Sequence, residues 1–146
     1  METINLNQLT AGESGIYLLA EAHFSGFAIE TFADGSLATQ MSLKRGMHDG
    51  VTRRWHPDGQ LASEKSFRNG AEHGWHREWN PDSVLAVQSQ WKAGECSHMR
   101  KWDEQARLIY EMWRDGPASM ARSQYFEMRD DGSWVEIKTD EGKEPA

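Results

Sequence analysis

The chain repeats itself every 24 residues, and no other feature of the sequence limits its possible folds as strongly. A shift of 24 positions aligns residues 50–59 (GVTRRWHPDG) with residues 74–83 (GWHREWNPDS). The match continues in residues 37–46 (LATQMSLKRG), 61–70 (LASEKSFRNG) and 85–94 (LAVQSQWKAG), which carry one segment three times. A period between about 20 and 50 residues is typical of stacked repeat architectures, so a repeat protein is predicted.

Each unit is predicted to be an antiparallel β-hairpin. An aromatic residue precedes a corner such as Ala33–Asp34–Gly35 or Pro57–Asp58–Gly59, and Asp and Gly favour tight turns because they tolerate positive φ. The aromatic residues in this place are Phe32, Trp55, Trp79 and Trp102. Residues 85–91 alternate with the period of two of a β-strand, and Lys-Arg-Gly, Arg-Asn-Gly or Lys-Ala-Gly ends each such strand. We therefore expect a mostly β protein whose tandem antiparallel hairpins form one elongated, twisted sheet.

The repeats are expected to form a single domain over residues 1–138. It contains a half-unit at 18–26, units at about 26–49, 50–73, 74–97 and 98–116, and a degenerate capping hairpin at 117–138 around Asp131–Gly132. The pattern weakens outward, as it commonly does in the end units of solenoids. The unit at 98–116 keeps Trp102 and Leu108 but lacks the Asp-Gly corner, so a less regular hairpin is expected there. The acidic segment 139–146 is predicted to be a mobile tail.

The composition is that of a soluble protein, with 38% hydrophobic and 27% charged residues among 146. No apolar stretch approaches the roughly 20 residues of a membrane span, and residues 1–15 lack the basic start and apolar core of an export signal. The protein is therefore expected in the cytoplasm. The single cysteine, Cys96, excludes an internal disulfide framework and has no partner at zinc-site spacing, so it is interpreted as a strand or turn residue.

The formal net charge of −7 is unevenly distributed. Residues 1–43 hold five acids and no Lys or Arg, and residues 125–146 hold seven acids and three bases, whereas the Trp-rich centre is nearly balanced. This charge disfavours nucleic acid and anionic lipid as partners and favours a basic protein. Keeping the protein soluble is the alternative role of these acids.

One stretch resembles a known repeat. Residues 58–70 (DGQLASEKSFRNG), followed by His73–Gly74–Trp75 and Trp79, are similar to the bacterial variant of the MORN repeat, whose pattern is roughly NGxLxxExxYxNGxxHGxWxxYY. The resemblance covers about residues 18–116, and the chain departs from the pattern at Val84, at Asp103 and in the stretch Gln105–Ala106–Arg107. Bacterial proteins of this kind are commonly described as antitoxin or immunity components, and eukaryotic MORN proteins are associated with membranes and scaffolding. The resemblance therefore implies a binding role, by analogy at the level of the fold.

No catalytic, cofactor-binding or metal-binding residues are predicted. His48, His73 and His98 lie 25 residues apart at the family's His position, where we expect each imidazole to bond turn backbone and stack on its copy in the next unit. A metal could only recruit His73 and His76, whose spacing in a strand points them to opposite faces. The glycines recur with the repeat and are explained by turns, not by a phosphate-binding loop.

An arginine stands two residues before each corner tryptophan, so the two types are expected to alternate along one face of the sheet. This ribbon has two interpretations: internal packing of arginine stems on rings, or a recognition surface, since Trp and Arg are enriched at interface hot spots. The candidate partner-binding residues are Arg53, Trp55, Arg77, Trp79, Arg100, Trp102, Asp130 and Asp131.

The function predicted first is that of a cytoplasmic immunity or antitoxin protein that binds and occludes a cognate, basic toxin. The main alternative is a scaffold or adaptor, which could also self-associate through the edge strands of the sheet. Single-strand nucleic-acid binding on the Trp and Arg ribbon is a third class, disfavoured by the net charge. An enzyme is the class with least support in the sequence.

Overall fold

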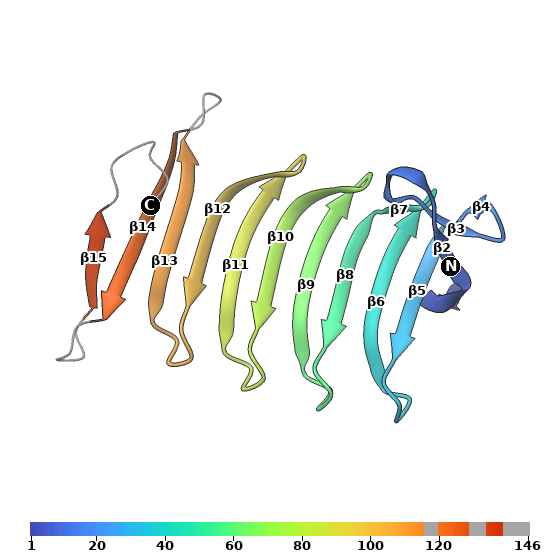
Figure 1. Ribbon diagram of the computed structural model, residues 1–146, viewed down its shortest axis with the longest axis horizontal. Helices are drawn as coiled ribbons and strands as arrows, with labels where there is room; N and C mark the ends of the chain where they lie inside the picture. Colours follow the sequence, from blue (N-terminus) through green and yellow to red (C-terminus); the bar gives the residue numbers. More distant parts are fainter. Residues whose placement is uncertain (116–119, 129–133, 139–146) are drawn as a thin grey trace.

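The computed structural model describes residues 1–115, 120–128 and 134–138, and these form one elongated, mainly antiparallel sheet with a small second sheet at its N-terminal end (Figure 1). The predicted fold class is confirmed. In the order of the main sheet, the strands are β1 (Thr3–Asn5), β5 (Gly26–Thr31), β6 (Leu37–Lys44), β8 (Gly50–Trp55), β9 (Leu61–Arg68), β10 (Ala71–Trp79), β11 (Leu85–Lys92), β12 (Glu95–Trp102), β13 (Leu108–Asp115), β14 (Met120–Met128) and β15 (Trp134–Lys138), with β7 (Met47–His48) paired to β6.

The hairpin corners at one end of the strands share one geometry. In each corner the fourth residue donates its N–H to the carbonyl of the first, at 2.9 to 3.0 Å, and lies at positive φ. These fourth residues are Gly35, Gly59, Ser83 and Ala106. Each corner is thus a three-residue loop whose last residue has the left-handed backbone conformation. Beside each corner, the pairing register of the two strands shifts by one residue.

The corner between β12 and β13 is as regular as the others, although it lacks Asp-Gly. The carboxylate of Asp103 accepts N–H bonds from Gln105 and Arg107, both at 2.9 Å, and Asn80 does the same for Asp82 and Val84 one unit earlier. The expectation of a less regular hairpin here was wrong. Asp103, the first residue of this corner, accepts the hydrogen bonds, whereas Asp34 and Asp58 accept theirs from the third position of their corners.

The opposite ends of the hairpins carry tight two-residue turns that also join neighbouring units. Both central residues have positive φ in Arg45–Gly46, Asn69–Gly70 and Ala93–Gly94, as a type I′ turn requires. The glycine N–H of each turn donates to a carbonyl of the preceding unit. The accepting carbonyls belong to Phe24, His48 and Glu72, at 2.7, 2.8 and 2.9 Å. The repeat of 24 residues is therefore a repeat of inter-unit hydrogen bonds as well as of strands.

The buried core is small and lies at the N-terminal end. Strands β2 (Leu9–Ala11), β3 (Tyr17–Leu19) and β4 (Ala22–His23) form the second sheet, and two short 3-10 helices, η1 (Leu6–Gln8) and η2 (Glu13–Gly15), flank β2. The core residues are Ile4, Phe24, Ala28, Met41 and Leu43, with Leu6, Leu9, Tyr17 and Leu19 packed against them. This N-terminal layer covers the start of the sheet, where the apolar side chains would otherwise meet water.

The predicted half-unit at 18–26 forms a hairpin, but it belongs to the second sheet. The place beside β5 is taken instead by β1, which pairs with β5 in parallel over three residues. At the other end, β14 and β15 pair with each other in antiparallel fashion within the predicted cap. The corner predicted at Asp131–Gly132 and the tail 139–146 lie outside the described residues.

A ladder of rings runs across the units on one face of the sheet, which we call the ring face. His48 stacks on Phe67 at 4.7 Å between ring centroids, Phe67 contacts His76 at 5.7 Å, and His76 stacks on Trp91 at 5.1 Å. The predicted column of stacked histidines was wrong. The carbonyls of His48 and Glu72 accept equivalent inter-unit hydrogen bonds, so Glu72 occupies in its unit the position that His48 occupies in the unit before. His73 stands one residue later, because the structural period is 24 residues and the histidine spacing is 25.

Candidate functional site

The two faces of the central strands β8 to β13 carry different chemistry. On the face opposite the rings, one row of directly paired residues crosses the sheet and is entirely polar, so we call this the polar face. The row consists of Arg53, Glu64, Arg77, Gln88, Arg100 and Glu111. In the described part of the chain the main contacts of these strands are with their sheet neighbours, so no layer packs over either face there.

The arginines of the polar face are held by carboxylates. Arg53 Nε lies 2.9 Å from Glu64 Oε2, and Arg77 lies 4.0 Å from the other oxygen of Glu64. Arg77 also lies 5.3 Å from the ring centroid of Trp75, which is 39% exposed. The charges of this face are therefore largely paired within the sheet, at about 0 to 1 kcal/mol per exposed pair.

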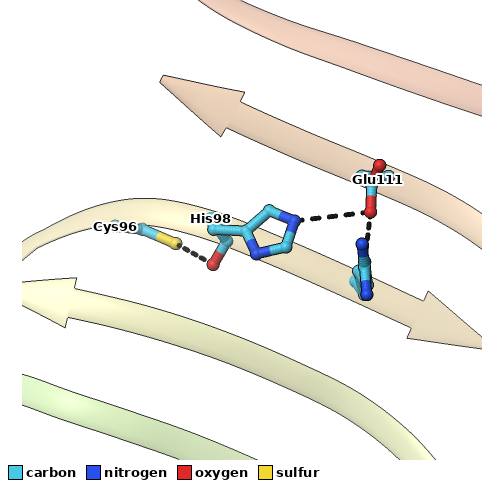
Figure 2. Close-up of polar contacts among 4 residues, drawn as sticks. Cys96, His98 and Glu111 are labelled. Atoms are coloured by element: carbon cyan, nitrogen blue, oxygen red, sulfur yellow. Dashed lines mark hydrogen bonds and ion pairs between the residues drawn. The ribbon is translucent and has the colours of Figure 1, made fainter. Parts of the chain in front are cut away.

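At the end of this row, on β12 and β13, the carboxylate of Glu111 is shared by two donors (Figure 2). Glu111 accepts from Arg100 Nε and from His98 Nε2, the latter at 3.3 Å. Burial alone would raise the pKa of Glu111, but the hydrogen bonds from Arg100 and His98 outweigh it and hold that pKa below its ordinary value. Beside them, the Cys96 thiol donates to the His98 carbonyl at 3.3 Å, and burial raises the thiol pKa. Cys96 is thus a strand residue, as expected.

On the ring face, the sheet is hollowed in two places. The first hollow, of about 500 Å³, lies over β8, β9 and β10. Its lining includes Arg54, Trp55, Lys65, Phe67, Glu78 and Trp79. The second, of about 270 Å³, extends over β9 to β12 and is lined in part by His76, Val87, Trp91 and Met99. The Lys65–Glu78 ion pair, 3.1 Å long, lines both hollows and stands where they meet.

The predicted ribbon of alternating arginine and tryptophan is divided between these environments. Arg53 and Arg77 bind Glu64 on the polar face, whereas Trp55 and Trp79 line the first hollow of the ring face. The ladder register shifts immediately before each of these tryptophans, which interrupts the alternation from which a common face was inferred. The cation–π partner of Arg77 is Trp75, two residues before it, instead of Trp79.

The remaining candidates are placed as follows. Arg100 is exposed and bound to Glu111, and Trp102 is half-buried opposite Leu108. Asp130 and Asp131 lie outside the described residues.

The prediction from sequence missed three residues of these surfaces, namely Arg54, Trp75 and Lys65. The signal for Arg54 was present, because two adjacent arginines in a strand must point to opposite faces. Trp75 was visible as the aromatic residue after the repeat glycine, but nothing local distinguishes an exposed ring from a packed one.

Among the described residues, no group of three or more His, Cys, Asp or Glu side chains is placed to hold a metal ion. The same part of the chain has no helix with the length and apolar character needed to cross a membrane. No protein-family model, curated protein or solved structure matches this chain.

Proposed function

We propose that this chain is a cytoplasmic, non-catalytic immunity or antitoxin protein that neutralises a cognate toxin by binding it and covering its working surface. The observation that carries the proposal is the ring face, which is an open surface lined by tryptophans and cations across consecutive hairpins. The resemblance of residues 18–116 to the bacterial MORN repeat supports the same role by analogy.

The ring face suits protein binding better than the polar face. On the polar face the arginines are already paired with Glu64 and Glu111, so a partner would have to compete with existing bonds. On the ring face, Trp55 and Trp79 are half-buried at an open hollow, and large aromatic side chains supply much of the binding energy at interfaces.

The charge of the chain supports a basic partner. The net charge of −7 attracts a cationic protein at distances of about one Debye length, roughly 8 to 10 Å at moderate salt, and so speeds association. Toxins that cleave nucleic acids need cationic surfaces for their substrate, so a nuclease is the toxin chemistry that fits best.

The test is affinity capture with tagged protein from the source cell, identification of the captured partner, and expression of that partner with and without this chain. The expected result is a partner that stops growth alone and is harmless when co-expressed. A captured partner without toxicity, or rescue without a physical complex, would contradict the proposal.

A scaffold or adaptor is the second candidate, and the end of the sheet favours it. Within the residues that the structure describes, strand β15 has a sheet neighbour on one side only, and unpaired strand edges can accept a further strand. Size-exclusion chromatography with light scattering separates the two candidates in part, because edge pairing predicts a mass that rises with concentration.

A further inference from the structure

The first hollow of the ring face contains a cation, Arg54, that has no partner among the described residues. Arg54 is exposed, and its guanidinium makes no ion pair or hydrogen bond within the described residues. The other cation of the hollow, Lys65, is neutralised by Glu78 at 3.1 Å. One unit of positive charge is therefore presented to whatever enters the hollow.

Two indoles stand beside this cation. Trp55 and Trp79 come from β8 and β10, with β9 between them, and neither ring contacts another ring in the part of the chain that the structure describes. Their flat surfaces can therefore hold an apolar or planar stem. The hollow, of about 500 Å³, has room for one or two side chains rather than for a folded element.

We propose that this hollow is the anchor site for the partner protein and takes an acidic side chain, with its carboxylate on Arg54 and its stem against Trp55 and Trp79. This inference rests on the proposed function. An arginine binds a carboxylate through two parallel N–H bonds, and the bonds strengthen where neighbouring rings exclude water.

The negative charge of the chain favours a single carboxylate of a protein over a polyanion such as nucleic acid as the ligand of this hollow. Near the hollow, Asp58 and Asp82 occupy exposed corners directly after β8 and β10, and the whole chain carries −7. A strand of nucleic acid would bring several phosphates against these carboxylates. A single carboxylate on a basic protein pairs with Arg54 locally, while the rest of the partner is attracted by the acids around the hollow.

The chemistry can be tested on the free protein with three probes that share a phenyl stem and differ in charge: phenylacetate, phenylacetamide and phenethylamine. Binding is followed by NMR on the indole N–H signals, with Trp75 on the polar face as the internal control. We expect phenylacetate to shift the Trp55 and Trp79 signals with a dissociation constant on the order of millimolar, and the Trp75 signal to stay in place.

Two variants assign the effect to Arg54. Arg54→Gln should weaken phenylacetate binding by about tenfold, the size expected for one charge-assisted interaction. Arg68→Gln removes the same charge at the far end of β9, outside the hollow, and should leave the binding unchanged. Equal binding of the three probes, shifts centred on Trp75, or an unchanged affinity in Arg54→Gln would overturn the anchor site. Tighter binding of a single-stranded oligonucleotide than of phenylacetate, lost in Arg54→Gln, would replace it with nucleic-acid binding.

The same variants separate this inference from the proposed function. Once a toxic partner has been captured, Arg54→Gln should weaken the complex by about tenfold and Arg68→Gln should not. A partner that is neutralised equally well by Arg54→Gln would leave the immunity function standing and reject the anchor site. A chain that binds phenylacetate as expected but rescues no partner would do the opposite.

Discussion

The imidazole of His76 stacks on the indole of Trp91, with ring centroids 5.1 Å apart and planes inclined by 24°. His76 is buried, and its Nε2 lies 3.2 Å from the Ser66 carbonyl oxygen, where a neutral imidazole can donate. Burial lowers the pKa of both His76 and His48, against smaller opposing effects that include the Ser66 hydrogen bond for His76 and Glu72 for His48. The ring ladder is thus built for uncharged histidines.

Stability should therefore fall as the pH is lowered through the ordinary histidine pKa, near 6.5. Below that value the unfolded chain binds protons that folded His48 and His76 do not, so the free energy of unfolding decreases until the lowered folded pKa is reached. Urea unfolding at pH 8, 7, 6 and 5 measures this. His76→Gln should reduce the slope, and the exposed His23→Gln should leave it unchanged. Equal midpoints at pH 8 and 5 would show that the ladder tolerates charge.

Glycine and alanine should have opposite effects when exchanged between equivalent corners. Gly59 has φ of +90° and open space where a Cβ would stand, so Gly59→Ala should cost about 1 kcal/mol from backbone conformation alone. Ala106 has φ of +60° at the same corner position, and Ala106→Gly should stabilise by a few tenths of a kcal/mol to about 1 kcal/mol. Both are read from denaturant midpoints, and a change of the same sign in the two variants would contradict a shared corner geometry.

Gly26→Ala should detach the first strand. A Cβ at this position would stand 2.4 Å from the Glu2 carbonyl oxygen and 2.8 Å from the Phe24 ring, so β1 must move from β5. We expect a loss of about 2 to 4 kcal/mol, because Ile4 would leave the core. Gly35→Ala is the control, since its φ is also positive but no atom lies within 4 Å of the added Cβ. A similar, small effect of both variants would show that β1 contributes little to the fold.

Glu111→Ala should cost about 1 to 2 kcal/mol at neutral pH, because Arg100 and His98 lose their common acceptor. Glu95, whose side chain is 76% exposed, lies 3.4 Å from Arg114, and Glu95→Ala should change stability by less than about 0.5 kcal/mol. The pKa of Glu111 is lowered, so its stabilisation is present above the ordinary carboxyl pKa and disappears as the pH falls through the folded value. Thermal unfolding of Glu111→Ala and Glu95→Ala at pH 7 and pH 3 measures both effects. Equal melting temperatures of the two variants at pH 7 would contradict the prediction.

The sequence was sufficient for the hairpins because their signals are local. Asn69–Gly70 and Pro57–Asp58–Gly59 specify turns by the φ values that their residues tolerate, and the period of 24 residues then places the strands. The pairing of β1 with β5 could not be predicted in the same way. Residues 3–5 carry no repeat signal, and their place in the sheet is decided by a contact with residues more than 20 positions away.

The candidate site was predicted only in part. Trp55 and Trp79 do stand on a hollowed surface, but their arginine neighbours Arg53 and Arg77 face the other way. Strict alternation predicts a common face for residues two apart, and the corner bulges override it. Glu64, a residue on another strand, pairs with Arg53 and thereby leaves Arg54 as the one of these two arginines without a partner in the described part of the chain.

The first hollow takes its walls from two successive hairpins, with Trp55 on one and Trp79 on the next. A single hairpin of this protein would therefore carry a tryptophan but no site, and the site belongs to the seam between units. A chain of several hairpins has one such junction fewer than it has units, and each junction can carry its own set of side chains. The second hollow, with His76, Trp91 and Met99 in its lining, is already such a variation. Inserting or removing one unit would thus change how many surfaces the protein can offer, without altering the architecture that carries them.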